Sequence, residues 1–207
     1  MNSVKTAAEP KGAFALNEAK YDSHKRLAEV YYIQKNYELA KTEFDEALKL
    51  AKSWNYTGWI AQANSQLGFV ALKERKLKVA AERFKEALGL YQYDANLSFG
   101  LGVLFAALSK PEDAKAEWNK ALKLRTGSDP LEGMVAAVTK VALGTPGAVE
   151  EMSSIIKQRP PTGMIQVALD DADSLVMFGI ALPASEEVRR MLAEAVEDGR
   201  KQAAQQE

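Results

Sequence analysis

The stretch GLGVLFAALSKPEDAKAEWNKALKL, residues 100–124, carries an arrangement of small and large apolar residues that occurs twice earlier in the chain. RLAEVYYIQKNYELAKTEFDEALKL (26–50) and QLGFVALKERKLKVAAERFKEALGL (66–90) align with it without gaps. In each copy a Leu and a small residue are followed by an Ala, a large aromatic residue and a second Ala at the same spacing. In residues 100–124 these are Leu101-Gly102, Ala114, Trp118 and Ala121. An internal repeat of this length indicates an array of stacked units.

This pattern resembles the tetratricopeptide repeat (TPR) family, whose unit is a 34-residue antiparallel helix pair. The second and third copies lie 34 residues apart, and the first and second lie 40 apart. The resemblance implies an all-α, right-handed superhelical solenoid in which residues 19–128 hold three repeats. The same register predicts a degenerate fourth repeat at 129–162, where Ile155 departs from the small residue expected.

The two ends of the chain lack the repeat pattern. Residues 1–18 show no clear periodicity, and we predict a flexible segment. Residues 163–207 predict a C-terminal helical pair, over 163–181 and 184–204, that caps the solenoid. Pro111, Asp129-Pro130 and Thr145-Pro146 predict helix starts between these limits.

The glycines Gly100 and Gly102 raise the alternative of a phosphate-binding turn. That turn requires a preceding strand and a third glycine at position 105, which is Phe. We therefore interpret Gly102 as a contact between two closely packed helices. Gly100 keeps a possible role as a gap on the floor of a binding groove.

Few residues carry catalytic or ligating chemistry. The chain has no cysteine and one histidine, His24, so thiolate metal sites and His-based triads are excluded. Candidate ligands for a divalent ion are Asp170, Asp171 and Asp173. They lack the turn of a calcium loop, so a solvated helix face is favoured. We predict no enzyme activity, no cofactor, and no catalytic or metal site.

Charge is balanced overall and uneven along the chain. The formal net charge of −1 gives no general attraction to nucleic acid or an anionic membrane. In the basic run of residues 73–85, acidic residues are interleaved and no aromatic ladder occurs, which weakens a nucleic-acid role. Residues 55–128 carry 11 basic and 7 acidic side chains, and residues 129–207 carry 7 and 13. This asymmetry suits either an acidic partner or self-association of unlike ends.

No stretch resembles a signal peptide or a transmembrane span. The most apolar stretch, 163–182, contains three aspartates, which argues against membrane insertion. A cytoplasmic protein is expected, and a mature exported form remains an alternative.

The family resemblance implies that ligand peptides lie in a concave groove lined by the first helix of each pair. The helical period assigns that face. The partner-binding residues expected there are Lys25, Arg26, Glu29, Tyr32, Gln62, Ser65, Gln66, Phe69, Asn96, Phe99 and Val103.

Some relatives in this family clamp the terminal carboxylate of chaperone tails with Lys and Asn side chains. Lys25 matches one such position, whereas Glu29, Gln66, Asn96 and Gly100 stand at others, so this mode is not expected. The apolar face of the third repeat has two explanations. Either a partner's apolar segment docks there, or the chain's own C-terminal helices cover it.

The connector between the first two repeats is aromatic, with Trp54, Tyr56 and Trp59. These rings either pack together and bridge the repeats or form an exposed contact patch. The six extra residues in this region predict longer flanking helices.

The sequence thus predicts a noncatalytic protein-interaction scaffold, an adaptor or complex-assembly factor whose groove binds a partner protein or peptide. The alternative is a structural subunit that forms homo-oligomers through its repeats and its oppositely charged ends.

Overall fold

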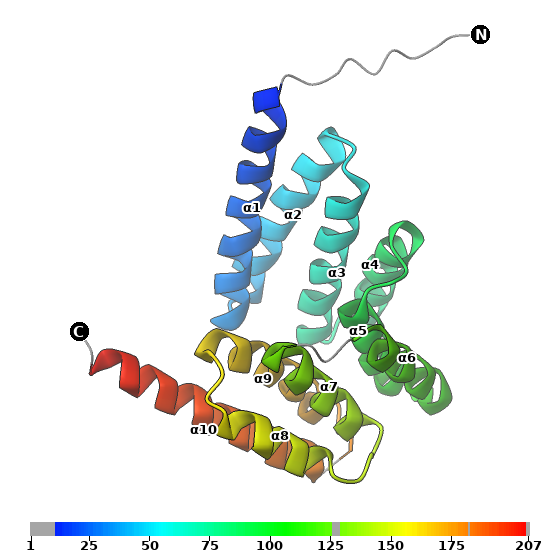
Figure 1. The fold of residues 1–207 in the computed structure, drawn as a ribbon. Helices are drawn as coiled ribbons and strands as arrows, with labels where there is room; N and C mark the ends of the chain where they lie inside the picture. Colours follow the sequence, from blue (N-terminus) through cyan, green and yellow to red (C-terminus); the bar gives the residue numbers. More distant parts are fainter. Residues whose placement is uncertain (1–10, 126–128, 182, 206–207) are drawn as a thin grey trace.

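A computed structural model of the chain describes residues 11–125, 129–181 and 183–205. All regular structure within those ranges is helical (Figure 1). The helices are α1 (Lys11–Ile33), α2 (Tyr37–Ser53), α3 (Thr57–Lys73), α4 (Leu77–Leu90), α5 (Ala95–Ala107), α6 (Pro111–Leu124), α7 (Pro130–Ala142), α8 (Ala148–Lys157), α9 (Thr162–Met177) and α10 (Ala184–Ala204).

The first six helices form three packed pairs, α1 with α2, α3 with α4 and α5 with α6. The turn inside each pair has the same backbone form, with one non-glycine residue at positive φ: Lys35 at 60°, Arg75 at 58° and Ser109 at 57°. In the second pair the amide of Lys76 donates to the carbonyl of Ala71 at 2.8 Å, which closes the end of α3. The repeat predicted from side chains is therefore also a repeat of backbone geometry.

Small residues lie where paired helices approach most closely. A Cβ added at Gly102 would overlap the indole of Trp118, and one added at Gly68 would overlap the ring of Phe84. The interpretation of Gly102 as a helix contact is therefore confirmed. Gly100 is no open gap, because a Cβ there would lie 2.8 Å from the ring of Phe69.

An aromatic cluster joins α1 to the α2–α3 turn. Trp59 stacks on Tyr21 with ring centroids 4.8 Å apart and meets Tyr56 at 4.5 Å. Phe14 contacts the same two rings, Trp59 and Tyr56. The bridging interpretation of this connector is confirmed, and α2 and α3 are both 17 residues long, against 14 for α4 and 13 for α5.

The prediction of a flexible segment over 1–18 is wrong for residues 11–18, which form the first turns of α1. The contacts of Phe14 with the aromatic cluster account for this longer helix. Residues 1–10 lie outside the described residues.

The last four helices pack on one another beneath the repeats (Figure 1). Helix α9 lies between α7 and α10 and ends at Met177, where Gly179 takes a φ of 67°. Ile165, Ala168, Ala172 and Leu175 of α9 belong to the same buried core as residues of α4 to α8. Within the described ranges, no helix combines the length and apolar character that crossing a bilayer requires.

Candidate functional site: a groove between the repeats and α9

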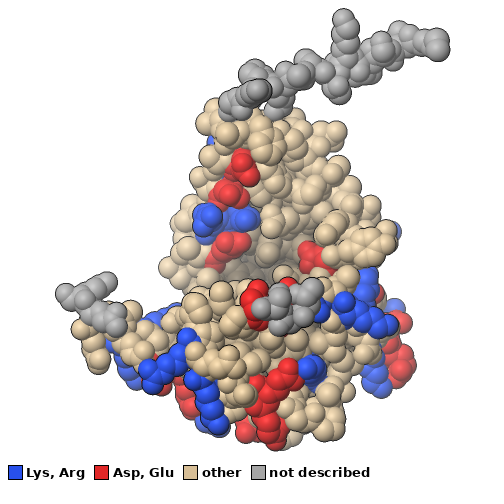
Figure 2. All heavy atoms as spheres, in the orientation of Figure 1, with Lys and Arg blue, Asp and Glu red and all other residues tan. Residues whose placement is uncertain are grey.

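A cavity of about 280 Å³ lies on the concave side of the repeats, where α9 faces α1, α3 and α5. Figure 2 shows this face of the molecule hollowed between the upper repeats and the lower helices. We call this cavity the groove. Its lining residues are Glu29, Tyr32 and Ile33 of α1, Phe44 of α2, Gln66 and Phe69 of α3, Asn96 of α5, and Val167, Asp170 and Asp171 of α9.

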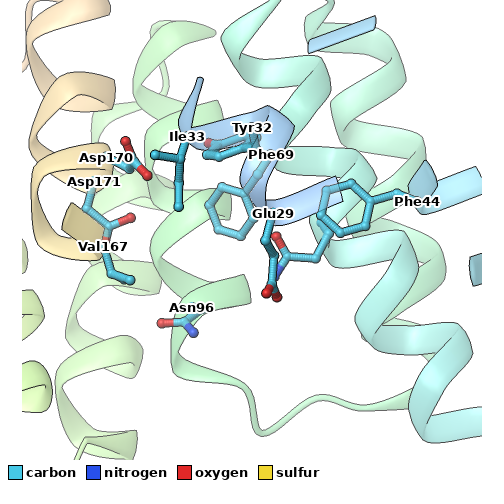
Figure 3. A pocket seen from close by; sticks show the side chains of 10 residues that line it. Glu29, Tyr32, Ile33, Phe44, Phe69, Asn96, Val167, Asp170 and Asp171 are labelled. Atoms are coloured by element: carbon cyan, nitrogen blue, oxygen red, sulfur yellow. The ribbon is translucent and has the colours of Figure 1, made fainter. Parts of the chain in front are cut away.

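Phe69 forms the apolar centre of the groove. Its ring meets Phe84 edge to face with centroids 5.3 Å apart, and Gly100 leaves the space against which it rests. Ile33 is 40% exposed and Val167 is 44% exposed, so two aliphatic side chains beside this ring remain open to a ligand. Figure 3 shows Phe69 between the α1 and α9 walls.

Helix α9 supplies an acidic wall. The Asp170 and Asp171 side chains are half-buried and line the groove (Figure 3). Burial raises the pKa of Asp170 to about 6, against the opposing pull of Lys73. Burial raises the pKa of Asp171 to about 7, although Arg125 and Lys73 oppose the rise. Both carboxyl groups thus titrate near neutral pH, because the groove solvates their charge poorly.

Three basic side chains from the turns of the first two repeats tie α9 in place. Lys73 donates from Nζ to the backbone carbonyl of Asp170 at 2.6 Å. Arg75 donates to the carbonyl of Met177 at 2.8 Å, and its guanidinium lies 5.5 Å from the centre of the Phe178 ring. Lys35 pairs with Asp173 at 3.4 Å. Some basic side chains of the repeats therefore bind the acidic C-terminal part of the same chain.

Lys73 is 8% exposed, an unusual position for an ammonium group. Burial lowers its pKa, while the nearby Asp170, Asp173 and Asp171 carboxylates act in the opposite direction. The carbonyl of Asp170 accepts a hydrogen bond from the Lys73 ammonium group. A buried cation with this partner fixes the end of α3 to the middle of α9.

Arg125 follows α6 and lies beside the α5 edge of the groove. Its Nη2 donates to the Asn96 Oδ1 at 3.1 Å, and burial lowers its pKa despite the attraction of Asp171. This contact orients the Asn96 amide.

The groove brings together five of the predicted partner-binding residues. They are Glu29, Tyr32, Gln66, Phe69 and Asn96. Gln62 and Ser65 instead line a second cavity of about 270 Å³ between α3 and the start of α5. Lys25 pairs with Asp22 at 3.5 Å, and Arg26 is exposed; neither lines these two cavities.

Phe99 and Val103 are wrongly placed by the sequence prediction. Phe99 is 1% exposed and Val103 is fully buried, in the same core as Ile165 and Ala168 of α9. The chain's own C-terminal helices thus share a core with the apolar third-repeat face, which was one of the two explanations. No partner can reach these two side chains in this fold.

The prediction for the aspartates of α9 is also corrected. A solvated face was favoured for Asp170, Asp171 and Asp173, yet the first two line the groove and the third pairs with Arg189 and Lys35. No cluster of three or more potential metal-ligating side chains occurs in the described part of the chain. Their presence in an otherwise apolar helix was the available signal that this face meets polar groups.

Val167 completes the groove and was not predicted as a site residue. It comes from the same C-terminal helix as the aspartates, and only the docking of α9 brings it to Phe69.

Residues 20–92 match a family model described as the tetratricopeptide repeat. No curated protein matches the sequence. Among solved structures, the chain is similar to YrrB, described as a TPR protein with an unusual peptide-binding site. That similarity has 19% sequence identity and a TM-score of 0.43, and covers 91% of this chain and 93% of that chain.

Proposed function

We propose that this chain, which belongs to the tetratricopeptide repeat family through residues 20–92, is a noncatalytic scaffold that binds a segment of a partner protein in the groove. Its role would be that of an adaptor or complex-assembly factor. A scaffold of this kind needs an accessible concave surface with an apolar centre and polar groups that fix orientation.

The observation that carries this proposal is that the groove stays open although α9 packs beside it. A cavity of about 280 Å³ remains, with the ring of Phe69 at its centre and the half-exposed Val167 at its edge. Polar side chains surround this apolar centre, among them Gln66 and Asn96. An extended peptide can place the apolar part of one side chain on Phe69 and pair its backbone with these amides.

Selection from a displayed random-peptide library against the immobilised full chain tests the proposal. The selected peptides are then titrated by fluorescence anisotropy against Val167→Ala and Val79→Ala. Val79 is a matched control, because it is 41% exposed and lies on α4 outside the groove. We expect Val167→Ala to weaken binding about fivefold, because two buried methyl groups are lost, and Val79→Ala to leave it unchanged. Equal effects of the two variants would contradict a binding site in the groove.

One observation favours a second function, self-assembly through the first helix. Leu16, Leu27 and Val30 lie on one side of α1 and are 56%, 41% and 48% exposed. A second copy of the chain would cover this stripe. Sedimentation velocity at two salt concentrations tests the idea, with a dimer expected for the unaltered chain and a monomer for Leu27→Lys. A strictly monomeric unaltered chain at both salt concentrations would reject it.

A further inference from the structure

We propose that the groove selects partner segments that carry a lysine or arginine side chain, which would lie with its stem on Phe69 and its charged end between Glu29 and the aspartates of α9. This inference rests on the proposed function, since it names the chemistry of the segment that the same groove would bind. The partner is an extended segment of another protein.

The charge of the groove lining supports this choice. Glu29, Asp170 and Asp171 all line the cavity, and no lysine or arginine among the described residues does so. Glu29 comes from α1, whereas both aspartates come from α9, so acidic groups stand on two opposing walls (Figure 3). A cation entering between them would meet carboxylates from both sides.

These carboxylates are poorly supplied with hydrogen-bond donors. Within the described part of the chain, Asp171 and Glu29 accept no hydrogen bond from a side chain or backbone amide. Asp170 accepts one long bond, from Gln166 at 3.4 Å. A guanidinium or ammonium group entering the cavity would supply hydrogen-bond donors to these carboxylates.

The cations closest to the groove are already engaged. Lys73 donates to the carbonyl of Asp170, Lys35 pairs with Asp173, and Arg125 donates to Asn96. Arg189 of α10 also pairs with Asp173. Lys73, Lys35 and Arg189 hold α9 in place, and Asp170 and Asp171 both line the cavity.

The apolar part of the groove fits the remainder of such a side chain. The methylene stem of lysine or arginine packs readily on apolar surface while its end stays polar. Phe69, Ile33 and Val167 provide that surface beside the carboxylates. The face of the Phe69 ring would add a cation–π contact for a guanidinium group.

The titration of the aspartates agrees with this geometry. Burial raises the pKa of Asp170 to about 6 and that of Asp171 to about 7. The titratable groups that face them are Lys73 of α3, Lys35 beyond α1, Arg125 beyond α6, Tyr32 of α1, Tyr37 of α2, and Asp173 of α9 itself. A bound cation would favour the ionised carboxylates and release protons, so affinity would rise with pH across this range.

The test uses three pools of synthetic peptides with blocked ends, incubated with the immobilised full chain. The central residue is arginine, its neutral isostere citrulline, or glutamate, and the flanking positions are randomised. Recovery of each pool is measured by mass spectrometry at low and high salt. We expect about tenfold higher recovery of arginine than of citrulline peptides at low salt, with a smaller ratio at high salt.

Two variants locate the preference. We expect Asp170→Asn with Asp171→Asn to bring the arginine-to-citrulline ratio close to one, whereas Asp198→Asn, on the exposed face of α10, leaves it unchanged. Glu29→Gln, on the opposite wall and outside the contacts that hold α9, should lower the ratio as well. It decides the matter if the double variant fails to fold.

The outcomes separate this inference from the proposed function. Peptides that are retained and are sensitive to Val167→Ala, but show no preference for arginine, would overturn the inference and leave the scaffold function standing. Preference for glutamate would overturn it equally. If no peptide is retained in any pool, both proposals fail.

Discussion

The ammonium group of Lys73 donates to the backbone carbonyl of Asp170 at 2.6 Å, across 97 residues of sequence. This bond joins the end of the second repeat's first helix to the middle of α9. The wall of the groove is therefore held by the repeats themselves, and its stability depends on residues outside the family pattern.

Arg75 also holds α9 against the repeats, and its removal should weaken the packing of α9. Arg75→Ala loses a hydrogen bond to Met177 and the contact with Phe178, so we expect the free energy of unfolding to fall by about 1–2 kcal/mol. Urea denaturation measures this change, and hydrogen exchange of the α9 amides should become faster. Lys78→Ala, an exposed site on α4 nearby, should change stability by less than about 0.5 kcal/mol. Equal effects at the two positions would contradict the role of Arg75.

Gly102 is required where α5 meets α6. We expect Gly102→Leu to lower the free energy of unfolding by about 1–3 kcal/mol, because the new side chain would overlap the indole of Trp118. Gly89→Ala is the control, since a Cβ at Gly89 meets no atom within 4 Å. It should leave stability unchanged or raise it by up to about 1 kcal/mol. A Gly102→Leu protein as stable as the unaltered one would show that this contact is not tight.

The ionised carboxylate of Asp171 should lower the free energy of unfolding at neutral and basic pH. In the unfolded chain its carboxyl ionises near its ordinary pKa of 3.8, whereas in the folded chain burial raises the pKa to about 7. The stability contributed by the protonated group is therefore fully present below about pH 4 and is lost as the pH rises through 7. We expect Asp171→Asn to raise the free energy of unfolding at pH 8 by about 1–2 kcal/mol, a value reduced for partial solvent screening.

Thermal unfolding at pH 5 and pH 8 measures this difference. The gain from Asp171→Asn should be larger at pH 8 than at pH 5. A gain that is the same at both pH values would exclude titration of Asp171 as its cause.

The aromatic cluster should hold the first turns of α1. Trp59→Leu removes the stacked partner of Tyr21 and a contact of Phe14, so we expect a loss of about 1–3 kcal/mol in unfolding free energy. Hydrogen exchange in residues 14–21 should accelerate. Tyr93→Leu is the matched control, because Tyr93 is 66% exposed and lies on the α4–α5 connection. Unchanged exchange in α1 after Trp59→Leu would show that the cluster does not hold this helix.

The helix pairs could be predicted from the sequence because their contacts obey a fixed spacing. Gly102 with Trp118 and Gly68 with Phe84 are separated by the same 16 residues, and both contacts are present in the structure. The longer helices around Trp54 followed from the extra residues in the same way. Local contacts of this kind are visible to periodicity alone.

The groove could be predicted only on the side of the repeats. Glu29, Tyr32, Gln66 and Phe69 follow from the helical period, but Asp170 and its neighbours come from a helix far away in the sequence. Two of the bonds that hold α9 end on backbone carbonyls, those of Asp170 and Met177. Every residue type offers such a carbonyl, so nothing in the sequence marks these two as partners of Lys73 and Arg75.

The position of α9 also sets how a ligand can thread the solenoid. Lys35, Lys73 and Arg75 bring α9 to the ends of the first two repeats, so a ligand segment that runs along the groove toward those ends would meet α9. Peptides that bind in the groove should then share one spacing between their basic residue and the end of the peptide that meets α9.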